Sequence, residues 1–131
     1  MTIKNVSKHG LLLSLSVILF FLLSGCTMPP SKNAAKEVIT KYFEAKRYKV
    51  VEIEIGNIKP IPINEQRYMG TKGYLIDVEA ITLEANEDIG SPVIYKKGEK
   101  LTFNNGRITI REKSDKKGDW IISNISGIAI L

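Results

Sequence analysis

A 13-residue apolar run, residues 11–23, ends just before the only cysteine of the chain, Cys26. The ten residues before the run are polar and weakly basic, with Lys4 and Lys8 and no acidic residue. As a helix the run would span about 20 Å, against a hydrocarbon core of about 30 Å in a bilayer. A basic start, a short apolar middle and small residues after it are typical of a secretory signal peptide. We therefore expect residues 1–25 to be removed and the fold to come from residues 26–131.

The remaining 106 residues carry 17 basic and 14 acidic side chains, a net charge of +3. This length supports one core that buries roughly two-thirds of the surface of the unfolded chain, which excludes a multidomain enzyme. A small net charge on an exported chain does not favour nucleic acid as a partner. With one cysteine the domain has no internal disulfide, so its stability must come from packing.

The four residues Leu23, Ser24, Gly25 and Cys26 resemble a lipobox, the motif read by the enzymes that process bacterial lipoproteins. The resemblance implies a diacylglyceryl group on the Cys26 thiol, cleavage between Gly25 and Cys26, and an N-acyl lipid on the new amino terminus. Several acyl chains on one residue make a lasting anchor, whereas a single chain binds a bilayer only marginally. The implied location is the extracytoplasmic face of the cell membrane, with the lipid bilayer as partner through Cys26. An uncleaved signal anchor and a signal peptide followed by a chance cysteine are the alternatives.

Residues 26–33 contain two prolines and read as the lipidated cysteine and a semi-extended tether. Residues 34–131 read as a single domain. Its start is helical, because apolar residues recur there at three- and four-residue spacing up to Tyr42 and Phe43. We expect Asn33 to cap this helix and the helix to end near Arg47.

A β-branched run follows the helix and predicts a strand, with Val51, Ile53 and Ile55 on one face. Residues 57–71 contain Pro60, Pro62 and Gly70 and fit no period, so we expect a loop or an irregular edge there.

Residues 74–84 alternate apolar and polar side chains and are the clearest prediction of a long strand, with a bulge near Ala80 where the phase slips. Asn105 and Gly106 predict a tight type I′ hairpin turn between residues 101–103 and 108–110. A second hairpin is expected over residues 110–125. Residues 127–131 are apolar and should finish an edge strand or tuck under the sheet.

Together these elements predict an α+β domain: one N-terminal helix packed on a curved antiparallel sheet of four to five strands. The order resembles the cystatin-like and NTF2-like folds. Residues 107–125, RITIREKSDKKGDWIISNI, are similar to the final hairpin of small NTF2-like domains in bacterial lipoproteins. We expect aromatic side chains to fill the space between helix and sheet, namely Tyr42, Phe43, Tyr48, Phe103 and Trp120. Tyr68 and Tyr74 would lie at the mouth of any pocket.

Residues 26–131 contain no histidine and, once Cys26 is acylated, no free thiol. This excludes Ser-His-Asp and Cys-His catalysis and zinc sites with Cys or His ligands. Asp77 and Glu79 lie two apart on one strand face, about 7 Å along the backbone, a separation that a carbohydrate-processing hydrolase could use. The alternative is a solvated outer face, which we favour because the sequence supplies no apolar pocket around either carboxyl group.

Two further clusters of acidic residues lack the spacing of an EF-hand loop. The first is Glu84, Glu87 and Asp88, and the second is Asp115 and Asp119. We expect no metal and no cofactor.

Basic residues recur near the C-terminal hairpin and predict a possible basic patch: Arg107, Arg111, Lys113, Lys116 and Lys117. Such a stripe could bind anionic lipid headgroups, an anionic wall polymer or another envelope protein. Lysines on strand edges also prevent strand-to-strand aggregation, which is the alternative reading.

These features favour a binding or assembly module that acts without catalysis. A hydrolase using Asp77 and Glu79 is one alternative and requires those carboxyl groups to lie in a cleft. A peptide-binding or inhibitory domain is the other, and it requires an unpaired sheet edge without lysines facing outward.

Overall fold

The computed structural model describes residues 29–113 and 115–131, so the predicted signal peptide, residues 1–25, and Cys26 lie outside the described residues. Two helices and four strands make up the described chain. In chain order they are α2 (Lys32–Ala45), β1 (Tyr48–Pro60), α3 (Ile63–Met69), β2 (Gly73–Ala85), β3 (Lys100–Lys113) and β4 (Lys116–Ser126).

Helix α2 begins two residues earlier than expected, because Ser31 and not Asn33 is its N-cap. The Ser31 hydroxyl accepts a 3.1 Å hydrogen bond from the backbone N–H of Ala34. The apolar stripe of the helix is fully buried at Ala35, Ile39 and Phe43. The helix ends at Ala45, close to the predicted end at Arg47.

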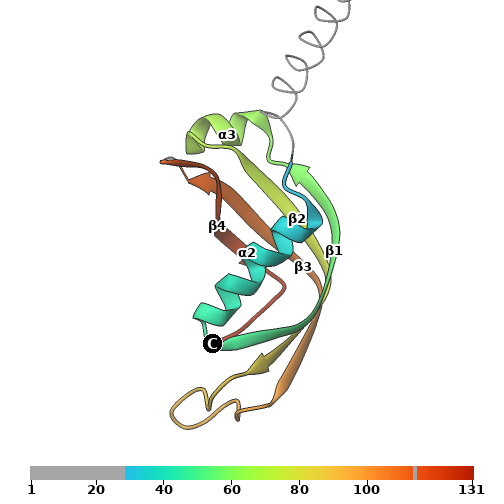
Figure 1. Ribbon diagram of the computed structural model, residues 1–131, viewed down its shortest axis with the longest axis vertical. Coiled ribbons are helices and arrows are strands. Elements are labelled where there is room, and N and C mark those ends of the chain that lie inside the picture. Colours follow the sequence, from blue (N-terminus) through green and yellow to red (C-terminus); the bar gives the residue numbers. More distant parts are fainter. Residues whose placement is uncertain (1–28, 114) are drawn as a thin grey trace, which may run out of the picture.

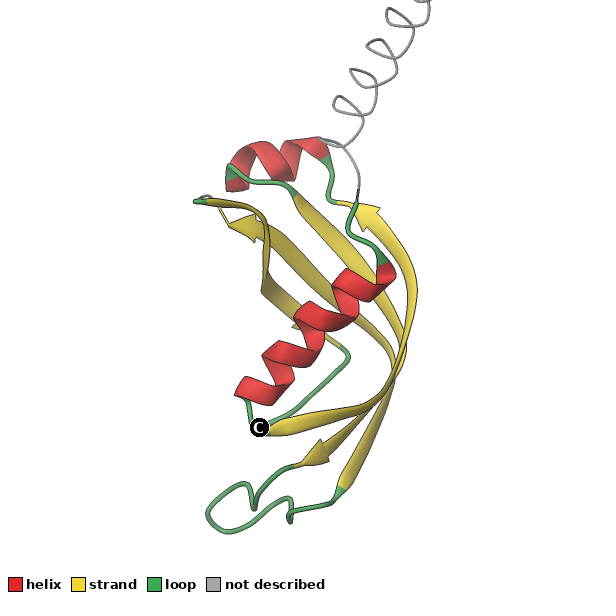
Figure 2. Ribbon diagram, viewed as in Figure 1, coloured by secondary structure: helices red, strands yellow, loops and turns green. Residues whose placement is uncertain are grey.

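The four strands form one open antiparallel sheet in the order β1-β2-β3-β4. Figure 1 shows the sheet curving around α2, which lies in its concave face, and Figure 2 shows the convex face without a helix over it. The predicted α+β architecture is therefore confirmed, with four strands in the sheet.

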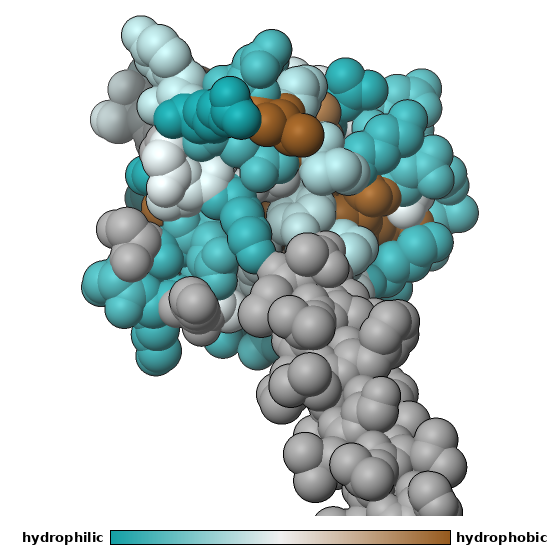
Figure 3. Space-filling view, turned by 90° about the horizontal axis from the view of Figure 1, so that it is seen from above, coloured by the Kyte–Doolittle hydropathy of each residue, from teal (hydrophilic) through white to brown (hydrophobic). Residues whose placement is uncertain are grey.

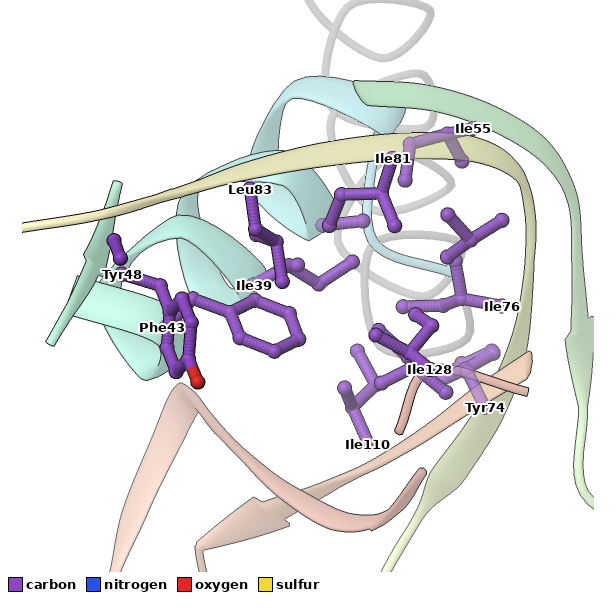
Figure 4. Packing of buried hydrophobic residues seen from close by; sticks show 14 of the residues in the cluster. Ile39, Phe43, Tyr48, Ile55, Tyr74, Ile76, Ile81, Leu83, Ile110 and Ile128 are labelled. Atoms are coloured by element: carbon purple, nitrogen blue, oxygen red, sulfur yellow. The ribbon is translucent and has the colours of Figure 1, made fainter. Parts of the chain in front are cut away.

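The core fills the space between α2 and the concave face (Figure 4). Strand β2 lies inside the sheet and supplies the most of it, through Ile76, Val78, Ile81 and Leu83, while β3 adds Ile108 and Ile110. Among the described residues no polar or charged residue is buried apart from tyrosine. Packing of apolar surface therefore holds the domain together.

The predicted change of phase in β2 is present. Val78 and Ile81 both face the core and exposed Glu79 lies between them. In the pairing of β1 with β2, Val78 lies opposite Ile55 and Ala80 opposite Glu54, so Glu79 is an extra residue. Such a bulge bends a strand and increases its twist, which is how the sheet curves around the helix.

The predicted hairpin turn at Asn105 and Gly106 is wrong, because β3 continues without interruption through both residues. Residues 101–103 pair with β2, at Leu83, Thr82 and Ile81, and not with residues 108–110. The Asn-Gly pair does mark an unusual backbone conformation, because Asn105 has φ 58°, the left-handed conformation that asparagine tolerates. Here that conformation bends a strand next to the bulge at Glu79 and does not reverse the chain.

The stretch 57–71, expected to be a loop or an irregular edge, holds the end of the edge strand β1, beside a shift in its register, and the short helix α3. The helix is preceded by Pro62 and ends at Gly70, whose φ of 70° suits a helix C-cap. Strand β1 is also irregular near Val51, which is 44% exposed, while Val50 and Ile53 pack against the core. The prediction that Val51 shares a sheet face with Ile53 and Ile55 is therefore wrong.

The second predicted hairpin is confirmed, since β3 and β4 pair from Lys113–Lys116 to Arg107–Ser126. The C-terminal residues tuck under the sheet as expected. Ile128 is 6% exposed, and a Cβ at Gly106 would come within 2.8 Å of its side chain. The five predicted aromatics are buried in the core or packed against it.

The bend at Asn105 can be tested with its neighbour as control. Replacing Asn105 by Val should lower the free energy of unfolding by about 1–2 kcal/mol, because a β-branched residue disfavours the left-handed conformation. Asn104→Val should have little effect, since Asn104 is exposed and does not have a positive φ. Urea unfolding of both variants measures the difference, and equal stability of the two would contradict the bend.

Candidate functional site

The two predicted acidic residues line an open hollow of about 430 Å³ on the convex face of the sheet. Asp77 and Glu79 point there because Ile76 and Val78, their neighbours in β2, point to the core. Asn105 and Arg107 of β3 and Ser126 at the end of β4 complete the lining. The hollow thus forms where the two inner strands bend.

The hollow is open to solvent, and two of its three charged side chains form an ion pair. Arg107 Nε lies 3.2 Å from Asp77 Oδ1, with the two side chains 59% and 33% exposed. Glu79 is exposed, and Gly56 leaves room for it, because a Cβ there would lie 3.1 Å from Glu79 Oε1. A catalytic acid of a glycosidase needs apolar enclosure, and these side chains lie on an open polar surface.

Four residues of the predicted basic patch have described side chains, and they are spread along β3 and the start of β4. Arg107 lies at the hollow with Asp77, whereas Arg111, Lys113 and Lys116 lie at the end of the sheet, around the β3–β4 turn. Lys113 Nζ is 3.3 Å from Asp119 Oδ2. The side chain of Lys117 lies outside the described residues.

The two aromatics expected at a pocket mouth, Tyr68 and Tyr74, differ in burial. Tyr74 is 6% exposed and packs edge-on against Trp120, with ring centroids 5.4 Å apart. Burial, and to a lesser extent the negative charge of Glu112, raises the pKa of Tyr74 above its ordinary value. Tyr68 on α3 is 97% exposed, so the two do not share a pocket.

Sequence analysis missed an exposed apolar tip in the β2–β3 connection, residues 86–99, which we call the distal loop. Val93 and Ile94 are 49% and 56% exposed there. Two backbone hydrogen bonds between Ile89 and Tyr95 close the part of the loop that carries this pair. The signal was the apolar triplet Val93 to Tyr95 between turn residues, which is unusual in a solvated connection.

The acidic residues of this region make contacts of their own. The Asp88 carboxylate accepts a 2.9 Å hydrogen bond from the backbone N–H of Lys97, and Arg47 Nη1 lies 3.1 Å from Glu87 Oε1. Among residues 29–113 and 115–131, no group of three or more acidic, His or Cys side chains could hold a metal ion. The described helices are all too short or too polar to cross a bilayer.

Comparison with protein-family models, curated proteins and solved structures finds no match to the chain.

A double-mutant cycle tests whether the hollow is wet. Because Asp77 and Arg107 are both partly exposed, their coupling free energy should be about 0.2–1 kcal/mol and should fall as salt is added. Unfolding of Asp77→Ala, Arg107→Ala and the double variant gives the coupling. A value of several kcal/mol that resists salt would indicate a desolvated pair and favour the hydrolase alternative.

Proposed function

We propose that the chain is the precursor of a bacterial lipoprotein whose mature form is held on the extracytoplasmic face of the cell membrane by lipid on Cys26. In this proposal the small α+β domain is a binding or assembly module without catalytic activity. Its partners are the bilayer through Cys26 and another envelope protein or an anionic wall polymer.

The observation that carries the proposal is the position of the two ends of the domain. Helix α2 begins at Lys32, a few residues after the lipobox cysteine, and the first described residues lie at the same end as α3 (Figure 1). The distal loop lies at the opposite end. An anchor at Cys26 would therefore present the exposed pair Val93 and Ile94 away from the bilayer.

We also propose that the domain is related to the cystatin-like and NTF2-like folds. The support is an N-terminal helix held in the concave face of a curved antiparallel sheet. Fold alone does not define an activity, so the functional proposal depends on the anchor and the distal loop.

The peptide-binding alternative has one observation in its favour. Within the described residues, β4 pairs with β3 alone, so its outer edge has free hydrogen-bonding positions. Residues 118–126 contain no lysine or proline, which are the residues that commonly block an edge. An extended peptide could add to this edge.

Cys26→Ala should leave an unprocessed precursor without lipid, because the thiol that accepts the diacylglyceryl group is gone. Ser24→Ala is the matched control, since alanine is also small and the cysteine remains. Incorporation of labelled fatty acid and the mobility of the protein on a gel report both steps. Lipid incorporation that survives in Cys26→Ala would contradict the anchor.

Replacing Val93 and Ile94 by Ser should abolish crosslinking between the distal loop and an envelope partner, because the apolar contact is lost. The readout is a photoactivatable residue at Lys96, used in intact cells. Val51→Ser is the control, because Val51 is equally exposed on β1. Both variants should keep their free energy of unfolding within about 0.5 kcal/mol, as surface changes usually do. Crosslinking unaffected by the loop variant would contradict a role for this loop.

A further inference from the structure

We infer that the end of the domain beside the first described residues docks on the anionic phospholipid headgroups of the bilayer that holds Cys26. This inference rests on the proposed anchor, and it assigns a partner to a surface that the anchor alone does not use. We call this surface the proximal end: α3, the start of α2 and the β3–β4 turn.

The antiparallel topology brings these segments together. The end of β1, the start of β2, the end of β3 and the start of β4 must all meet at one end of the sheet. Helix α3 joins β1 to β2 there, and the backbone N–H of Glu112 donates to the carbonyl of Lys72, linking the chain after α3 to the β3–β4 hairpin. The first half of α2 borders the start of β4, because Ala34 and Val38 line a hollow with Trp120.

The length of the tether keeps this end close to the lipid. Because the N-cap is Ser31, only four residues lie between it and Cys26, which makes five Cα–Cα steps. Even fully extended they reach about 18 Å, so the proximal end cannot move far from the headgroups.

The proximal end also carries a net positive charge, which suits contact with anionic headgroups. It carries six basic residues, Lys32, Arg67, Lys72, Arg111, Lys113 and Lys116, against four acidic ones, Glu65, Glu112, Asp115 and Asp119. Within this end Lys113 forms an ion pair with Asp119, and Glu112 accepts a hydrogen bond from the backbone N–H of Gly118, so six basic and four acidic residues leave a net charge of +2. The opposite end is balanced, since residues 86–100 contain three basic and three acidic residues. Basic side chains near an anionic membrane surface are attracted to it within about one Debye length.

Helix α3 exposes two side chains that packing does not explain, Tyr68 at 97% and Ile63 at 69%. Tyrosine favours the headgroup level of a bilayer, where its ring meets apolar groups and its hydroxyl stays hydrated. Figure 3 looks onto this end, and its visible surface is mostly hydrophilic with isolated apolar spots. The surface therefore suits contact with headgroups and not insertion into the hydrocarbon core.

The test uses the acylated mature protein, residues 26–131, reconstituted into vesicles. With Cys26 blocked by lipid, Tyr68→Cys carries the only free thiol and takes an environment-sensitive dye; Val93→Cys is the matched label at the other end. The dye at position 68 should show a blue shift in vesicles of phosphatidylcholine with phosphatidylglycerol, and no shift in phosphatidylcholine alone. The shift should vanish in about 1 M salt, where the Debye length is about 3 Å, and position 93 should show none.

Charge variants give a second readout. The pair Arg67→Glu with Lys116→Glu should abolish the shift, whereas Lys96→Glu with Lys97→Glu, the same change of charge at the far end, should keep it. Flotation with the vesicles reports the anchor separately. A protein that floats while the dye at position 68 stays in water overturns this inference and leaves the anchor standing; a protein that does not float overturns both. A shift of equal size in phosphatidylcholine alone, or one that appears only when wall polymer or another envelope protein is added, also overturns it.

Discussion

The fold depends on one constraint: the apolar stripe of α2 has to be covered by a sheet that curves around it. A flat four-stranded sheet would contact a single helix along a narrow strip and leave the remaining apolar side chains in water. The extra residue at Glu79 and the left-handed backbone at Asn105 bend the two inner strands at the same level. Because of that bend, Ile76 and Leu83, on either side of it, both reach the core around the helix.

The same bend determines the shape of the outer surface. It places Glu79 and Asn105 beside the ion pair of Asp77 and Arg107 and so creates the convex hollow. At Gly106, next to the bend, Ile128 from the C-terminal tail packs so closely against the strand that a Cβ would come within 2.8 Å of its side chain. The hollow is thus explained as a consequence of folding, and its acidic residues need no catalytic role to account for their presence.

Much of the architecture could be predicted from sequence because it depends on periodicity. The helix follows from apolar residues at three- and four-residue spacing, and the long strand 74–84 with its change of phase and the last hairpin follow from alternating apolar residues. The errors have physical reasons. Asn105 and Gly106 favour positive φ, but a local preference cannot distinguish a chain reversal from a bent strand, which depends on the pairing of residues 101–103 with β2. Helix α3 gave no periodic signal because its apolar residues Ile63 and Tyr68 face solvent. The residues of the predicted basic patch are spread along the sheet, with Arg107 at the bend and Lys116 at the end of the sheet.

The proposed role depends most directly on the chemical state of Cys26 in the native protein. Mass spectrometry of the N-terminal peptide, taken from protein extracted from its own membrane, tests it without any variant. The account predicts that the peptide begins at Cys26 and carries the mass of a diacylglyceryl group together with an N-acyl chain. A peptide that begins at Met1, or one with an unmodified Cys26, would contradict it.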